Sequence, residues 1–176
     1  MEGSLFETRE VFIPNKEIRD EFVTAIRDAG WSELINAIQA SDNLVKAAWE
    51  GDSQAVAKAI ENSRYETSII KYNDENSLSC VVSLAFYSAR QYYDIRRETP
   101  AGKGFADLSF MPRKNHPDRP AMIVELKWGK SALEAIQQIE GKEYAEILKA
   151  YKGNALLIGI NYDKDTKRHE CMIKRY

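Results

Sequence analysis

Three charged residues lie within two apolar segments that have the character of β-strands. Asp107 lies in the middle of segment 105–111, and Glu125 lies in segment 121–128 with Lys127 two positions later. Side chains two positions apart on a strand point to the same face, so Glu125 and Lys127 are predicted to project together. If the two strands pair, Asp107 lies beside Glu125, and two carboxylates meet one ammonium on an otherwise apolar sheet.

This set of groups suits a hard metal ion. Charged groups on a buried sheet are unfavourable unless they are paired or bind a metal. Carboxylate oxygens are the ligands that Mg²⁺ prefers, and Mn²⁺ accepts the same ligands. Such an ion acidifies water and stabilises charge on a phosphodiester, while a lysine can orient the attacking water. The spacing is equally compatible with a salt bridge between Lys127 and Asp107 or Glu125, and the sequence leaves this alternative open.

Two further polar residues are candidates for the same site. Glu75 begins the predicted helix 73–92, on the stripe that carries Leu78 and Val82, so its carboxylate could reach a metal. An acidic residue in the first turn also favours the positive end of a helix without any ligand. Gln137 lies on the next predicted helix and could orient a phosphate or a water, or could fill a buried polar gap.

Changes in apolar periodicity predict the elements that position these residues. The order is α-β-β-β-α-β-β, which predicts an α/β fold with a mixed sheet flanked by helices. Ser131 and Glu134 form a capping-box pattern at the start of the second helix. The predicted elements are a helix over 73–92, strands over 93–98, 105–111 and 121–128, a helix from 131 to about 150, and strands over 154–161 and 168–174.

Residues 1–70 are predicted to form a helical subdomain, separate from an α/β domain over 71–176. Asn15, Ser41 and Asp52 are each predicted to cap the start of a helix in the first part. Residues 1–70 carry a net charge of −6, with 7 basic and 13 acidic residues, whereas residues 71–176 carry +4, with 18 and 14. Nucleic acid is therefore expected to bind the second part, and protein partners are expected to bind the acidic helices.

The sequence excludes several other kinds of site. Cys80 and Cys171 are the only cysteines and are predicted to be buried thiols rather than zinc ligands. His116 and His169 are the only histidines, which excludes a multi-histidine metal site. The stretch Gly129-Lys130-Ser131 resembles the end of a phosphate-binding loop, but the glycine required five residues earlier is absent, so no nucleotide cofactor is expected.

The composition predicts a soluble globular protein, because 44% of the residues are hydrophobic and 30% are charged. The longest strongly apolar run, 155–160, is too short to cross a bilayer, and the first residues do not have the pattern of a secretory signal. A cytoplasmic location without membrane association is expected.

Three motifs resemble the PD-(D/E)XK nuclease superfamily: Gly-Lys-Gly-Phe-Ala-Asp107, then Ile-Val-Glu125-Leu-Lys127-Trp, then Ala-Ile-Gln137-Gln-Ile. More narrowly, they resemble the nuclease-like domain at the C-terminus of a bacterial AAA-type ATPase family. The resemblance implies a restriction-endonuclease-like fold, with Asp107 and Glu125 as metal ligands and Lys127 as the catalytic lysine. It also implies that Glu75 is the acidic residue of the first core helix, that Gln137 is the polar residue of the later helix, and that residues 1–70 match a region that follows an ATPase module.

Two functional hypotheses follow from the site and the resemblance. The first is a Mg²⁺-dependent nuclease that hydrolyses phosphodiester bonds in DNA, with Asp107, Glu125 and Glu75 at the metal. The alternative is a nuclease-like module without catalytic activity, which binds nucleic acid or protein as part of a larger ATPase-linked protein.

Overall fold

The structure is a computed structural model of the 176-residue chain. It describes residues 31–66, 72–101, 104–141, 150–151 and 153–176. The chain divides into two compact units, 1–37 and 38–176, and the candidate site residues lie in the second. The predicted helix that begins at Asn15 lies outside the described residues.

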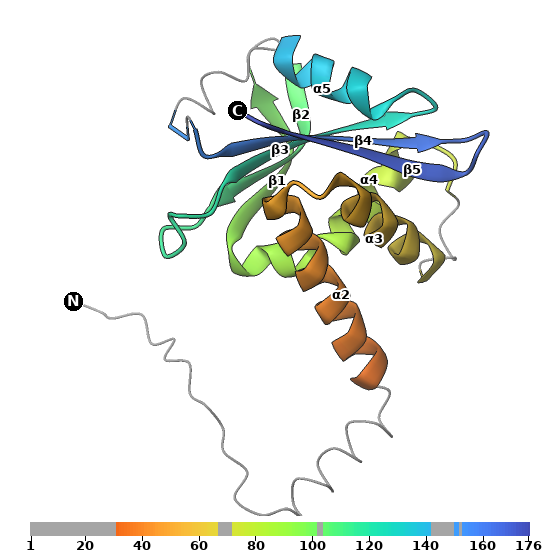
Figure 1. Ribbon diagram of the computed structural model, residues 1–176, viewed down its shortest axis with the longest axis horizontal. Coiled ribbons are helices and arrows are strands. Elements are labelled where there is room, and N and C mark those ends of the chain that lie inside the picture. Colours follow the sequence, from red (N-terminus) through yellow and green to blue (C-terminus); the bar gives the residue numbers. More distant parts are fainter. Residues whose placement is uncertain (1–30, 67–71, 102–103, 142–149, 152) are drawn as a thin grey trace, which may run out of the picture. The chain divides into compact units, whose positions relative to one another are not determined.

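The second unit is built on a five-stranded mixed sheet with the strand order β1-β2-β3-β4-β5 (Figure 1). Strands β3 and β4 are parallel, and the other neighbouring pairs are antiparallel. Helix α5 connects the two parallel strands, as a parallel connection requires. The strands are β1 (Tyr93–Ala101), β2 (Gly104–Pro112), β3 (Ala121–Trp128), β4 (Ala155–Asp163) and β5 (Arg168–Arg175).

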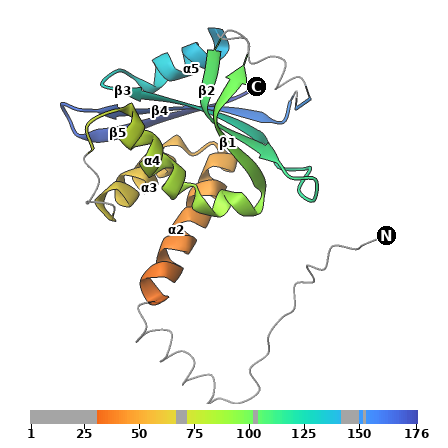
Figure 2. The same cartoon turned by 180° about the vertical axis from the view of Figure 1, so that it is seen from behind.

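Helices cover both faces of the sheet (Figures 1 and 2). On one face lie α2 (Trp31–Glu50), α3 (Ser53–Glu66) and α4 (Glu75–Ala85), and on the other lies α5 (Ala132–Gly141). The α/β class, the mixed sheet and the predicted element order are confirmed, consistent with a restriction-endonuclease-like fold. None of the helices in the described part of the chain is long and apolar enough to span a membrane.

The N-terminal helices differ from the sequence-based expectation. Ser41 does not begin a helix but lies inside α2, because its hydroxyl donates to Ala85 O at 2.7 Å and accepts from Ser88 N at 2.9 Å. Asp52 caps α3 as predicted, since its Oδ1 accepts from Ala55 N at 3.0 Å. The helix predicted over 73–92 is divided into α4 and a 3-10 helix at Tyr87–Gln91.

The predicted boundary between residues 70 and 71 does not coincide with the division seen in the structure. Leu44 and Val45 of α2 and Ile60 of α3 are buried in the same hydrophobic core as α4 and the sheet. Apolar burial of this kind is the main force that holds elements in one unit. The helical segments from residue 38 onward therefore belong to the same compact unit as the sheet.

Helix α5 packs unusually close to the sheet. A Cβ added at Gly159 on β4 would collide with the carbonyl oxygen of Ala132, at the start of α5. Ser131 caps this helix as predicted, because its hydroxyl accepts from Glu134 N at 3.1 Å and donates to Oε1 of Glu134 at 3.3 Å. Gly159, which has no side chain, and the cap at Ser131 together fix where α5 begins. They therefore also fix the position of the polar residues of α5 above β3.

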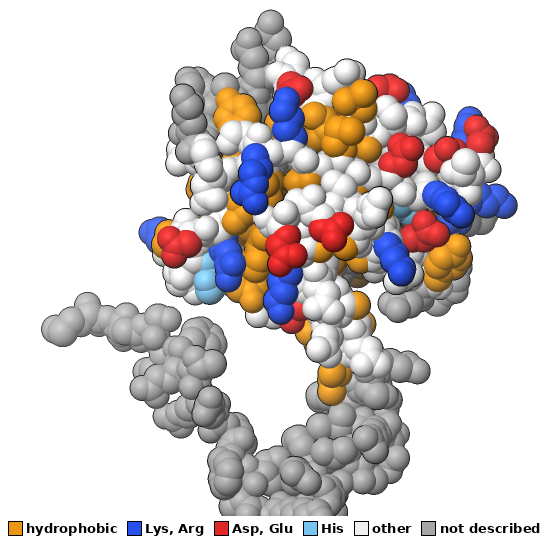
Figure 3. Space-filling model, in the orientation of Figure 1, with side chains coloured by type: hydrophobic (Ala, Val, Ile, Leu, Met, Phe, Trp, Pro, Cys, Tyr) orange, Lys and Arg blue, Asp and Glu red, His pale blue; other side chains and the backbone are white. Residues whose placement is uncertain are grey.

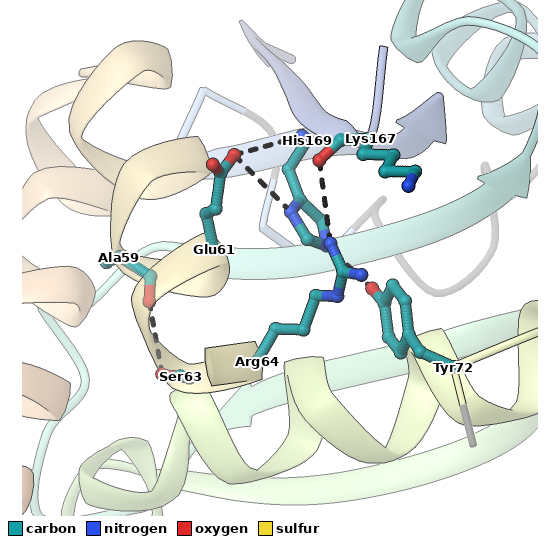
Figure 4. A network of polar contacts seen from close by, with 7 residues as sticks. All are labelled: Ala59, Glu61, Ser63, Arg64, Tyr72, Lys167 and His169. Carbon is teal, nitrogen blue, oxygen red and sulfur yellow. Dashed lines mark hydrogen bonds and ion pairs between the residues drawn. The ribbon is translucent and has the colours of Figure 1, made fainter. Parts of the chain in front are cut away.

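A buried polar network joins α3 to β5 (Figure 4). The Tyr72 hydroxyl lies 2.6 Å from Nε2 of His169, and Glu61 lies 3.8 Å from Nδ1 of the same ring. The guanidinium of Arg64 lies over the rings of Tyr72 and Tyr162, at 4.7 and 4.8 Å from their centroids. Burial raises the pKa of Tyr72 and lowers the pKa of His169 to about 4, so both side chains are neutral near pH 7.

The burial of His169 predicts an acid-sensitive fold. The unfolded histidine, with a pKa of about 6.5, takes up its proton at a higher pH than the folded one. Stability is therefore retained above pH 6.5 and is lost as the pH falls from 6.5 toward 4, by roughly 3 kcal/mol. The free energy of unfolding, measured by urea denaturation at pH 7 and pH 4, should fall between these pH values in the wild type. In His169→Gln the fall should be smaller by roughly 3 kcal/mol. An equal loss in both proteins would contradict the assignment.

Candidate functional site

Strand β3 places Glu125 and Lys127 on the face that α5 covers. Met122, Val124 and Leu126 point to the opposite face, into the core formed with α3 and α4. Glu125 and Lys127 are 2% and 6% exposed, and Nζ of Lys127 lies 3.4 Å from Oε1 of Glu125. The predicted projection of these two side chains to one face is thus present, and they form a buried ion pair within one strand.

Helix α5 contributes a glutamine to this pair, but it is not the one predicted. Gln138 donates its side-chain amide to Oε1 of Glu125, whereas Gln137 is exposed. Gln137 lies one turn after Leu133, which is 49% exposed and so marks the outer face of the helix. The inward stripe of α5 is formed by small and apolar residues, namely Ala132, Ala135, Ile136 and Ile139. The spacing of that stripe is the sequence signal that could have identified Gln138.

Asp107 lies where β2 and β3 stop pairing. The paired positions end at Leu108 and Val124, so the next backbone N–H groups of β3 have no partner from the β2 ladder. The side chain of Asp107 takes over this role, since its Oδ2 accepts from Leu126 N at 2.7 Å. Buried backbone donors require a partner, and here a carboxylate supplies it. The nitrogen of Leu126 is bonded to the carbonyl carbon of Glu125, so Asp107 lies against the peptide of Glu125.

The alternation of β2 is also interrupted at Asp107. Ala106 and Leu108 are two positions apart and would share one face of a regular strand, yet Ala106 is buried on the α5 side and Leu108 on the α4 side. On the neighbouring strand β1, Glu98 has a φ of 48°, and the pairing of β1 with β2 omits Glu98 and Asp107. Local distortions of this kind re-aim a side chain and end the pairing of strands. The distortion explains why Asp107 reaches toward β3.

Glu75 is the first residue of α4 and is exposed. Its position is fixed by Asp74, which caps the helix by accepting from Ser77 N at 2.8 Å. A hollow of about 410 Å³ lies between the start of α4 and the strands, and it is lined by Asp74, Glu75, Asn76, Ser79, Arg97, Glu98, Asp107 and Leu126. Glu75 and Asp107 therefore line the same hollow, and the predicted role of Glu75 at a metal stays a prediction.

Four of the predicted site residues, together with Gln138, form two groups that meet at one peptide, and the predicted Gln137 belongs to neither. Glu125, Lys127 and Gln138 form the first group on the α5 side, and Glu75 and Asp107 form the second beside the hollow. The described residues contain no cluster of three or more histidine, cysteine, aspartate or glutamate side chains that could hold a metal. The three carboxylates predicted as metal ligands are therefore not gathered into one such cluster.

The cysteines differ from the prediction. Cys80 is exposed, because it lies on the outer stripe of α4, opposite the buried residues Val81 and Val82. Cys171 is largely buried on β5, and burial raises the pKa of its thiol to about 12. Neither cysteine lies among the residues that surround Asp107 or Glu125.

Comparison with known proteins identifies the family. A sequence profile of the PD-(D/E)XK nuclease superfamily matches residues 73–171, which is more than half of the chain. The chain belongs to the PD-(D/E)XK nuclease superfamily. A search of curated proteins found no match.

Membership of the PD-(D/E)XK nuclease superfamily supports a nuclease-like function and the binding of nucleic acid. The assignment of Ala106-Asp107 and Glu125-Leu126-Lys127 to the two halves of the pattern in the superfamily's name, with alanine in place of the proline, stays a prediction. Ala106 is fully buried against the α5 side of the sheet.

Proposed function

We propose that this chain is a divalent-metal-dependent nuclease that hydrolyses phosphodiester bonds in DNA. The observation that carries the proposal is the hydrogen bond from Leu126 N to Oδ2 of Asp107. It holds a carboxylate of β2 against the peptide of Glu125 on β3, at the level where the two strands separate. The superfamily to which the chain belongs supports the class of reaction.

Asp107 and Glu125 would hold Mg²⁺, and Mn²⁺ could replace it. Two carboxylates are enough for such an ion, because Mg²⁺ is often bound through one or two carboxylates and keeps several waters that a substrate phosphate can replace. The buried carboxylate of Glu125 does not line the hollow beside Asp107, so it would have to turn toward Asp107 to share the ion. When bound, the ion would supply an activated water and stabilise negative charge on the phosphodiester. Glu75, which faces the same hollow as Asp107, is proposed to bind the outer waters of the ion.

The other polar side chains set the charge and orientation of Glu125. Lys127 neutralises this carboxylate in the free protein, and its ammonium would stabilise negative charge that develops on a phosphate bound beside Glu125. Both groups are buried, where charges interact more strongly than in water. Gln138 fixes the orientation of the carboxylate by donating to one oxygen. We assign this orienting role to Gln138 and no role in the site to Gln137.

A second candidate function is a nuclease-like module that binds nucleic acid without cleaving it. The buried ion pair between Glu125 and Lys127 favours this alternative, because a carboxylate that is already neutralised does not require a metal. The two functions differ in metal dependence and in bond cleavage, so one assay separates them.

The test is cleavage of end-labelled single-stranded DNA, duplex DNA and RNA by the wild-type protein with Mg²⁺, with Mn²⁺ and with EDTA. Glu125→Gln, purified in the same way, controls for contaminating nucleases. We expect metal-dependent cleavage of DNA by the wild type and none by the variant. If all substrates stay intact with both metals, the second candidate holds; cleavage that persists in EDTA would contradict the role of the metal.

A further inference from the structure

A basic groove adjoins the hollow that contains Asp107. Its volume is about 660 Å³, and it lies between α4, the 3-10 helix that follows it, and strands β1 and β2. The charged residues in its lining are four arginines and one aspartate, namely Arg90, Arg96, Arg97, Arg113 and Asp94. On the face of the molecule shown in Figure 3, by comparison, acidic and basic side chains are interspersed.

The groove and the hollow lie end to end. Arg97 lines both of them. On β1, residues 93–97 line the groove, and Arg97 and Glu98 line the hollow. On β2, Leu108 and Phe110 line the groove, and Asp107 lines the hollow. A molecule held in the groove therefore reaches the candidate site by passing Arg97.

The arginines differ in whether they form ion pairs. Arg113 contacts Asp94 at 3.4 Å and donates to Tyr93 O at 3.3 Å, which fixes its position. Arg96 and Arg97 are exposed and form no ion pair with any residue in the part of the chain that the structure describes. Both arginines line the groove, and unpaired guanidinium groups attract a polyanion and can bind phosphate oxygens in a bidentate manner.

We propose that this groove binds the phosphate backbone of one nucleic-acid strand and guides it to Asp107. The proposal rests on the proposed function and adds the binding surface to it. The aromatic residues of the groove floor, Phe86, Tyr93 and Phe110, are at most 1% exposed, so they offer no surface on which bases could stack. Recognition is therefore of phosphates and is independent of base sequence. The acidic hollow beyond Arg97 would repel a phosphate, and the arginines overcome this repulsion at its entrance.

The test is binding of fluorescent oligonucleotides, measured by anisotropy in EDTA so that no cleavage takes place. Arg96→Gln/Arg97→Gln keeps long polar side chains at exposed positions, and Arg168→Gln/Arg175→Gln removes the same charge from β5, at the other edge of the sheet. We expect the first variant to weaken binding by about a hundredfold, roughly tenfold for each arginine that can no longer bind a phosphate. We expect the control to weaken it less than threefold.

Single-stranded and duplex DNA of two unrelated sequences are measured in parallel, which shows whether the strand is bound alone or within a duplex. Equal weakening in both variants, no binding by the wild type, or a difference above tenfold between the two sequences would overturn the proposal. If the protein cleaves DNA but Arg96→Gln/Arg97→Gln binds as the wild type does, the nuclease function holds and the groove is not the binding surface. If binding depends on the groove but no cleavage occurs, the groove is the binding surface and the nuclease function is wrong.

Discussion

Asp107→Asn should reduce metal-dependent cleavage of DNA about a thousandfold while the protein remains folded. Asparagine keeps a side-chain oxygen that can accept from Leu126 N, so the link between β2 and β3 is preserved. It removes the negative charge that a divalent ion requires, and electrostatic groups of this kind contribute about a hundredfold to a thousandfold in rate. The measurement is the single-turnover rate with Mg²⁺, together with the thermal midpoint of each protein.

Asp107→Ala provides the comparison that separates chemistry from structure. Alanine removes both the charge and the acceptor, so this variant should also lose about 1–3 kcal/mol of stability. Asp165→Asn, on the exposed turn between β4 and β5, is the matched control and should keep wild-type activity. Substantial cleavage by Asp107→Asn would show that this carboxylate does not take part in the reaction.

Lys127→Met should destabilise the fold by about 3–5 kcal/mol. The substitution keeps a long apolar side chain but removes the ammonium from a carboxylate that is only 2% exposed. Leaving a charge buried after its partner is removed has this order of cost. The measurement is the free energy of unfolding from urea titrations near neutral pH.

Two further variants give this prediction its controls. Glu125→Gln/Lys127→Met removes both charges, so it should recover most of the lost stability. Lys174→Met breaks the exposed ion pair with Glu140 and should change stability by less than about 1 kcal/mol. If Lys127→Met were no more destabilising than Lys174→Met, the buried pair would not be a structural element of this sheet.

Local sequence patterns were sufficient to predict much of the fold. The predicted third strand, 121–128, coincides with β3, because Pro120 and Gly129 mark its two ends. Ser131 was correctly predicted to cap α5, since a capping box involves only neighbouring residues. Glu125 and Lys127 share a face because residues two apart on a strand always do.

Features that depend on distant residues were not predictable in this way. Ser41 has the side chain of a helix cap, but its partners lie on α4 and the 3-10 helix, so the sequence placed a helix start where none exists. Gln138 was missed because the choice between adjacent residues of α5 depends on which stripe packs on β3. The bond from Leu126 N to Asp107 depends on a distortion of β2 that strand periodicity does not reveal.

The most direct test of the metal role is a titration of the wild type, Asp107→Asn and Glu125→Gln with Mn²⁺, followed by electron paramagnetic resonance of the free ion. We expect the wild type to bind Mn²⁺ at a site that Mg²⁺ competes for, and each substitution to abolish this binding. A wild type that leaves all the Mn²⁺ free, or binding unchanged in both variants, would contradict it.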